Sequence, residues 1–185
     1  MNPSRHTSNP LVFSSDYGTS GDWTQNSTGV DVDSTAAGYV HCFEGGGADR
    51  HCLQALGTTM SDTTWIMDID FMWTSHVTST KGTFPYGLSA GAGQFDGSHY
   101  VGMQFTNTYA RTMKYDGGGT GQANSSFIFT TLVWEYARLR RNSATQVENL
   151  TYTTSARTTL ETGGSATLTC QSGLTGIDTI THAVN

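Results

Sequence analysis

Apolar and polar residues alternate along short segments of this chain, with the period of two that puts successive side chains on opposite faces of a β-strand. The run from Thr64 to Trp73 is the clearest example. Its large apolar residues occupy every second position: Trp65, Met67, Ile69, Phe71 and Trp73. The positions between them carry the carboxylates Asp68 and Asp70. This pattern predicts a strand with one face in a core and one face outward.

Similar segments recur along the chain at intervals of about 8–14 residues, separated by Gly, Asp, Asn and Ser clusters, as in β-sandwiches. They predict strands at Leu11–Phe13, Val30–Val32, Tyr39–Phe43, His51–Ala55, Thr64–Trp73, Phe84–Ala90, Tyr100–Thr106, Ala110–Tyr115, Leu132–Arg141, Gln146–Tyr152, Ala166–Cys170 and Thr179–Ala183. The Gly-rich stretches EGGGADR and YDGGGTGQAN are expected to be hairpin loops. We therefore expect one all-β domain over residues 11–185, an antiparallel β-sandwich, preceded by an N-terminal arm over residues 1–10.

Two further strands are expected to present polar and aromatic side chains outward. These are Tyr100 and Gln104 in YVGMQFT, and Trp134, Tyr136, Arg138 and Arg140 in LVWEYARLRR. Together with Asp68 and Asp70 they form a candidate ligand-binding set, because a pyranose needs an aromatic plane and a few polar groups that bond its hydroxyls. The alternative is that the arginines and aspartates form cross-strand ion pairs on a solvated face.

Composition narrows the possible functions. Charged residues make up 13% of the 185 residues, against about 25% in typical domains. The net charge is −6 and the lysines are Lys81 and Lys114, which excludes the basic patch of a nucleic-acid binder. No apolar run is long enough for a signal peptide or a membrane span, so we expect no membrane insertion. Sequons occur at Asn26, Asn124 and Asn149, and in a chain this rich in Ser, Thr and Asn they are weak evidence of glycosylation.

The order of GDWTQNSTGVDVD, TTWIMDIDFMW, PYGLSAG, YVGMQF and WEYARLRRNSATQVENLTYTT resembles the concanavalin A-like lectin/glucanase superfamily, and most closely the laminin G-like modules of microbial and viral surface proteins. The resemblance covers Leu11 to Ala183. It implies a concanavalin A-like jelly roll with a ligand-binding concave face or rim. The strand that usually ends such modules is missing after THAVN. A truncated piece, an N-terminal arm that folds back, or a strand donated by a neighbouring subunit would each explain this.

The same resemblance raises two questions of chemistry. Superfamily glucanases carry a Glu-x-Asp-x-x-Glu strand, and the matching stretch here has Asp68 and Asp70 but ends in Met72-Trp73, so the acid needed for retaining hydrolysis is missing and we expect no enzyme activity. Laminin G-like modules often bind calcium at the rim, which leaves Ca²⁺ as a possible cofactor. Its ligands would come from Asp68, Asp70 and the loop acids Asp22, Asp31, Asp33, Asp49, Asp96 and Asp116.

Cys42 and Cys52 flank the stretch EGGGADR. If the segments around them pair as a hairpin, their sulfurs face the same side and a cross-strand disulfide is allowed, with buried free thiols as the alternative. A zinc site from His41-Cys42 and His51-Cys52 would need a bulge, because adjacent strand residues point to opposite faces. Cys170 is expected to be a core residue.

These observations predict a non-catalytic module of the cell surface, extracellular space or virion that binds a glycan or cell-surface polysaccharide. The alternative is a structural subunit of a filament or virion, assembled by edge-strand pairing or by exchange of its N-terminal arm. Threonine-rich strands with few lysines lack the charged residues that usually prevent edge pairing, which favours this alternative.

Overall fold

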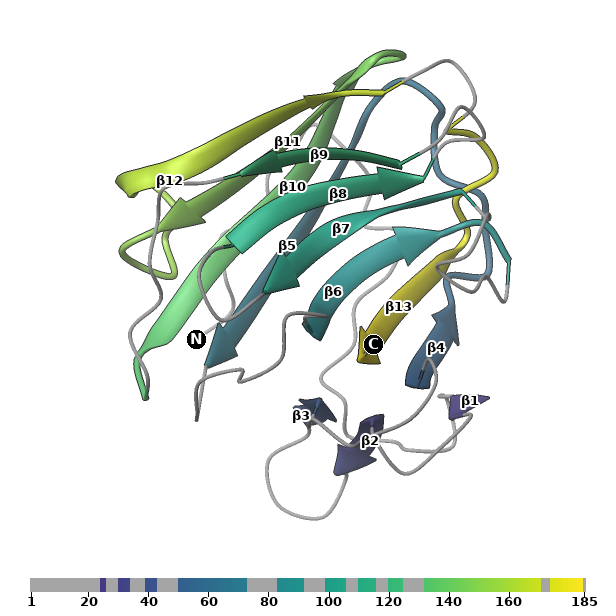
Figure 1. The fold of residues 1–185 in the computed structure, drawn as a ribbon, viewed down its shortest axis with the longest axis horizontal. Coiled ribbons are helices and arrows are strands. Elements are labelled where there is room, and N and C mark those ends of the chain that lie inside the picture. The colour runs from purple at the N-terminus through teal and green to yellow at the C-terminus, as the bar shows by residue number, and fades with distance from the viewer. Residues whose placement is uncertain are drawn as a thin grey trace.

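Two antiparallel β-sheets pack face to face in the computed structural model of the chain (Figure 1). The structure describes residues 24–25, 30–33, 39–42, 50–72, 83–91, 99–105, 110–115, 120–124, 132–170 and 174–184. Within these ranges there is no helix, and so none that could cross a membrane. The predicted class, an all-β antiparallel β-sandwich, is confirmed.

The larger sheet has seven strands in the order β1-β4-β13-β6-β7-β8-β9. Their bounds are β1 Thr24–Gln25, β4 Arg50–Ala55, β13 Thr179–Val184, β6 Thr83–Ser89, β7 Tyr100–Phe105, β8 Ala110–Tyr115 and β9 Thr120–Asn124. The C-terminal strand β13 lies between β4 and β6 and pairs with both, so it is an interior strand of this sheet.

The smaller sheet has four strands in the order β12-β11-β10-β5. Their bounds are β12 Leu160–Thr169, β11 Gln146–Tyr152, β10 Trp134–Ser143 and β5 Trp65–Met72. A separate two-stranded sheet joins β2 (Val30–Asp33) to β3 (Tyr39–Cys42). In Figure 1 the four-stranded sheet runs behind the seven-stranded one.

The core fills the space between the two sheets, and the period-two pattern explains which side chains reach it. Along β5 the buried residues are Trp65 and Ile69, and the residues between them that face the other way are exposed. Across the sandwich, the Phe71 ring of β5 lies 5.8 Å from the Tyr86 ring of β6, measured between centroids. Fully buried side chains each stabilise the fold by roughly 1.5–3 kcal/mol. They include Leu88, Val101, Met103 and Leu139, and the smaller buried residues Ala137 and Cys170 contribute less.

A polar contact crosses this core. Tyr86 is fully buried and donates from its hydroxyl to Oδ1 of Asn149 at 3.0 Å. The Asn149 amide nitrogen donates in turn to the Met103 sulfur at 3.3 Å. Burial raises the pKa of the Tyr86 phenol, so the hydroxyl stays protonated and remains a donor.

Most predicted strands appear within a few residues of their expected bounds, and Cys170 is a buried free cysteine, as expected. The stretch YDGGGTGQAN does connect the two strands of a hairpin, since Tyr115 of β8 lies opposite Thr120 of β9, but its second half is strand β9 and was predicted as loop. The predicted start of the strand at Ala166 was also wrong, because β12 begins at Leu160, before the glycines Gly163 and Gly164. Glycine is depleted in strands but does not prevent them, and the pairing of β9 with β8 and of β12 with β11 extends the sheets through both stretches. The predicted strand Leu11–Phe13 and the arm over residues 1–10 lie outside the described residues.

The hairpin predicted between the two cysteine segments was also wrong. β3 pairs with β2, where Cys42 lies opposite Val30. Cys52 in β4 has Gln25 on one side and His182 on the other, so both of its ladder positions are taken. The side chains of Cys42 and Cys52 lie outside the described part, and their disulfide remains a prediction without the pairing on which it was based.

Candidate functional site

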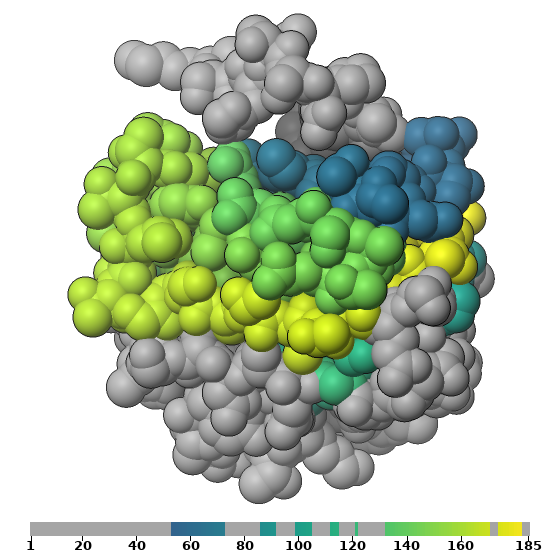
Figure 2. Space-filling view, turned by 90° about the horizontal axis from the view of Figure 1, so that it is seen from above, coloured from purple at the N-terminus to yellow at the C-terminus, as the bar shows by residue number. Residues whose placement is uncertain are grey.

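The candidate site is the face of the four-stranded sheet that points away from the core, called the outward face from here on. The β5–β10 register puts three residue pairs directly opposite each other on this face: Asp68 with Arg138, Asp70 with Tyr136, and Met72 with Trp134. Figure 2 shows residues 53–72 beside residues 132–152 on one side of the molecule. The structure therefore brings together six of the eight predicted site residues, since Arg140 lies on the same face opposite Ile66.

Arg138 and Asp68 form a bidentate ion pair. Arg138 donates from Nε to Oδ1 at 2.6 Å and from Nη2 to Oδ2 at 2.7 Å. The guanidinium carbon also lies 5.9 Å from the centre of the Tyr152 ring. The hydrogen bonds to Asp68 raise the pKa of Arg138, although partial burial opposes this. Both oxygens of Asp68 are therefore occupied.

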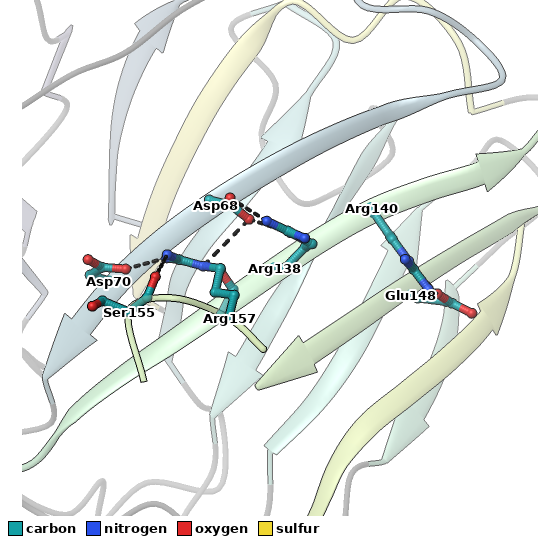
Figure 3. A network of polar contacts seen from close by, with 8 residues as sticks. Asp68, Asp70, Arg138, Arg140, Glu148, Ser155 and Arg157 are labelled. Atoms are coloured by element: carbon teal, nitrogen blue, oxygen red, sulfur yellow. Dashed lines mark hydrogen bonds and ion pairs between the residues drawn. The ribbon is translucent and has the colours of Figure 1, made fainter. Parts of the chain in front are cut away.

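Arg157, in the connection between β11 and β12, holds the second carboxylate. Its Nη2 donates to Asp70 Oδ1, and its Nε lies 3.6 Å from Asp68 Oδ1 (Figure 3). The guanidinium carbon lies 6.0 Å from the centre of the Tyr136 ring, and Nε also donates to the Ala137 carbonyl at 3.2 Å. The Arg157 side chain is only 7% exposed. The sequence did not reveal Arg157 as a site residue. It lies in a loop, and the alternation of residues along strands does not predict where a loop side chain lies.

A third ion pair completes the network. Arg140 lies opposite Glu148 on β11, and its Nε donates to Oε2 at 2.6 Å. Although burial acts to raise it, the hydrogen bonds from Asn142 and Arg140 hold the pKa of Glu148 below its ordinary value. The three arginines of the network balance three carboxylates (Figure 3). The predicted alternative of cross-strand ion pairs between the two arginines and the two aspartates is thus confirmed for Arg138 and Asp68, whereas Arg140 pairs with Glu148 and Asp70 with Arg157.

One end of the outward face is apolar and exposed. Trp134 is 53% exposed and Met72, directly opposite, is 39% exposed. Val133 and Leu132, which precede Trp134 along the chain, are also exposed. Leu132 has a φ of 63°, a conformation that non-glycine residues seldom adopt. These four residues are called the apolar end.

Tyr100 and Gln104 are not outward-facing ligands, which corrects the prediction made for them. Both lie on β7 in the other sheet, and they are 1% and 3% exposed. β7 is an interior strand covered on both faces, so its polar side is as buried as Val101 on its apolar side. Alternation identifies the two faces of a strand, but it does not reveal whether the polar face is covered.

Gly102 shows how closely Tyr100 packs. The Tyr100 hydroxyl donates to the Tyr86 carbonyl at 3.4 Å. A Cβ at Gly102 would meet the Tyr100 hydroxyl and lie 2.5 Å from that same carbonyl oxygen. A Cβ at position 102 would therefore overlap the Tyr100 side chain and the β6 backbone, so only glycine leaves room there.

The network determines which chemistry the outward face can support. An acid catalyst needs a carboxyl group that can carry a proton to the substrate, but here Asp68 and Asp70 both accept guanidinium donors. Calcium at the same carboxylates would have to displace Arg138 and Arg157. No group of three or more potential metal-ligating side chains occurs among the described residues. The loop acids Asp22, Asp49, Asp96 and Asp116 lie outside them, as do the side chains of Asp31 and Asp33, so calcium there remains a prediction.

Comparison with known proteins finds similarity to solved structures only. No family model matches the sequence, and no curated protein matches it. Among solved structures the chain is similar to domains LG4-5 of the mouse laminin alpha1 chain, with 13% identity and a TM-score of 0.44. The match covers 65% of this chain and 28% of the laminin chain. None of the three comparisons assigns a family or a function.

Proposed function

We propose that the chain is a non-catalytic surface or extracellular β-sandwich module that binds glycans at the apolar end of its outward face. The observation that carries the proposal is the exposure of Trp134, 53%, on a strand of a packed sheet. An exposed indole on a rigid strand offers a plane on which a pyranose ring can stack. The proposal includes a location outside the cell, on its surface or on a virion, and this rests on the resemblance to laminin G-like modules.

Polar groups that could orient a sugar lie next to this plane. Asp70 is two positions from Met72 on β5, so it is the diagonal cross-strand neighbour of Trp134, at a typical distance of about 7–8 Å. Its carboxylate is 47% exposed, and the contacts described for it use Oδ1. We assign Oδ2 of this partly exposed carboxylate as the acceptor of a hydrogen bond from a sugar hydroxyl. The neutral charge balance of the face favours an uncharged glycan over a strongly acidic one.

The ion pairs also support a non-catalytic role. Retaining hydrolysis needs one carboxyl as nucleophile and another as acid, about 5 Å apart. Here Arg138 holds both oxygens of Asp68, and Arg157 holds Asp70. We assign these carboxylates to holding Arg138 and Arg157 in place, with Asp70 as a secondary ligand contact.

Glycan-array binding tests the proposal. The wild-type chain is expected to bind a set of neutral glycans, and Trp134→Ala is expected to abolish this binding. Leu160→Ala is the matched control, because Leu160 is a 46% exposed apolar residue on β12. Loss of binding in both variants, or in neither, would contradict the assignment of the site to Trp134.

A structural subunit of a filament or virion remains the second candidate. Its support is edge strand β12, whose exposed residues Ser165, Thr167 and Thr169 carry no charge, and a filament would require this edge to pair with a different strand of the next subunit. Electron microscopy of the purified chain tests it, since this candidate requires polymers. Assembly through the N-terminal arm, residues 1–10, also remains a prediction, and deletion of the arm would test it.

A further inference from the structure

The two edges of the four-stranded sheet differ in chemistry. β5 forms one edge and carries Asp68 and Asp70 in the middle of its outward side. If β5 paired with β5 of a second copy about a central two-fold axis, these carboxylates would lie opposite each other, which is destabilising. Charged side chains of this kind protect natural edges from association. The β5 edge is therefore a poor surface for self-association.

β12 forms the other edge, and its charged residue, Glu161, lies in its first half, so the stretch Ser165–Thr169 carries no charge. Its residues Ser165, Thr167 and Thr169 lie opposite Leu150, Glu148 and Gln146 of β11, and their side chains are exposed on the outward face. All three bear hydroxyl groups and no charge. Thr–Thr and Thr–Ser pairs across antiparallel strands are favourable.

The hydrogen bonds of β12 show which backbone groups face the open edge. Cys170 N donates to the Thr145 carbonyl at 2.8 Å, so Cys170 directs its backbone toward the β11 side. Alternation in an antiparallel ladder then directs Leu168 and Ala166 the same way. Ser165, Thr167 and Thr169 consequently direct their N–H and C=O groups away from β11, toward the edge. Among the described strands, β11 is the partner of β12.

Only the second half of β12 is regular enough to pair with another strand. Leu150 pairs with Ser165 but Tyr152 pairs with Leu160, so β12 has extra residues between these two pairs. Gly163 in this irregular part has a φ of 75°. The bulge bends the first half of β12 away from a regular ladder. The regular stretch is Ser165–Thr169.

We propose that Ser165–Thr169 of β12 pairs antiparallel with the same segment of a second copy, about a two-fold axis at Thr167. Thr167 then lies opposite Thr167 of the second copy, and Ser165 lies opposite its Thr169. The three edge-directed residues of each copy supply about six inter-strand hydrogen bonds. Because such a contact is isologous, it closes a dimer and does not by itself propagate a filament. This inference does not depend on glycan binding.

Sedimentation velocity of the full chain over a wide range of concentrations tests the proposal. The wild-type chain is expected to show a concentration-dependent dimer. Thr167→Lys introduces two like charges at the two-fold axis, and it should be monomeric where the wild type is mostly dimeric. Gln146→Lys is the matched control, because Gln146 is exposed on the same face one strand inward, and it should still dimerise.

Thr167→Pro provides a second test of the same contact. Proline is tolerated on an edge strand where its missing N–H would face solvent, so this variant should fold and remain monomeric. Circular dichroism checks the fold, and if the proline variant fails to fold, Thr167→Lys decides alone. A wild-type chain that is monomeric at every concentration would overturn the proposal, even if the β12 edge binds a strand of another protein. A dimer that survives Thr167→Lys, or is lost in Trp134→Ala instead, would overturn it equally.

Discussion

Arg138 of β10 donates two hydrogen bonds to the carboxylate of Asp68 on β5, at 2.6 and 2.7 Å. Arg138 and Asp68 were both predicted as ligand-binding residues, and this contact makes them partners of each other instead. A carboxylate with both oxygens bound to a guanidinium fork is unavailable as a nucleophile, and it fixes the position of the arginine. The proposed ligand-binding part of the face is therefore the apolar end at Trp134, where no ion pair of the described residues lies.

The first prediction concerns the strength of this ion pair. The Arg138 side chain is 11% exposed and that of Asp68 is 39% exposed, so the pair lies between the exposed and buried cases. A double-mutant cycle of Arg138→Ala and Asp68→Ala should give a coupling free energy of about 1 kcal/mol in denaturant unfolding. A coupling energy indistinguishable from zero would show that the contact is solvated and contributes nothing.

The second prediction concerns the connection between β11 and β12. Arg157 has a φ of 52°, and its side chain ties residues 153–159 to the outward face. Arg157→Ala should speed hydrogen exchange in residues 153–159 and lower the free energy of unfolding by about 1 kcal/mol. Thr158→Ala, an exposed change in the same connection, should leave exchange unchanged. Equal exchange in both variants would contradict the role given to Arg157.

The third prediction concerns pH. The pKa of Glu148 is lowered in the folded state, so its pairing with Arg140 stabilises the fold above the pKa of the unfolded chain. This stability is lost as the pH falls through the lowered folded value. Wild type should therefore exceed Glu148→Gln in unfolding free energy at neutral pH, and the difference should shrink between about pH 5 and about pH 3. A difference that does not change with pH would rule out this linkage.

The fourth prediction concerns the sequon at Asn149. Asn149 is 2% exposed and its side chain points into the core toward Tyr86 and Met103. Folded protein from a glycosylating host should therefore carry no glycan at Asn149 when its peptides are analysed by mass spectrometry. Asn149→Ala should cost roughly 1–3 kcal/mol, because it leaves the Tyr86 hydroxyl without its acceptor. A glycan on Asn149 of the folded chain would contradict this core packing.

Much of the fold could be predicted from the alternation of residues alone. Trp65 and Ile69 on one side of β5, with Asp68 and Asp70 on the other, follow directly from the period of two. Pairing partners could not be predicted, because alternation does not encode which strands meet. The hairpin expected between the cysteine segments was wrong for this reason.

The candidate site, like the fold, could be predicted only in part. The sequence identified Arg138 and Asp68 as residues of one face, and it left open whether they bind a ligand or each other. Tyr100 and Gln104 failed as site residues because burial of a polar strand face depends on the rest of the chain. Arg157 could not be found, since its position depends on the path of a loop.

Isothermal titration calorimetry with a neutral glycan distinguishes non-catalytic binding from hydrolysis, because a binder gives saturable heats and an enzyme gives continuing heat from turnover. We expect saturable heats for the wild type and for Asp68→Asn, and none for Trp134→Ala. Continuing heat that disappears in Asp68→Asn, or binding that persists unchanged in Trp134→Ala, would contradict a non-catalytic glycan site at Trp134.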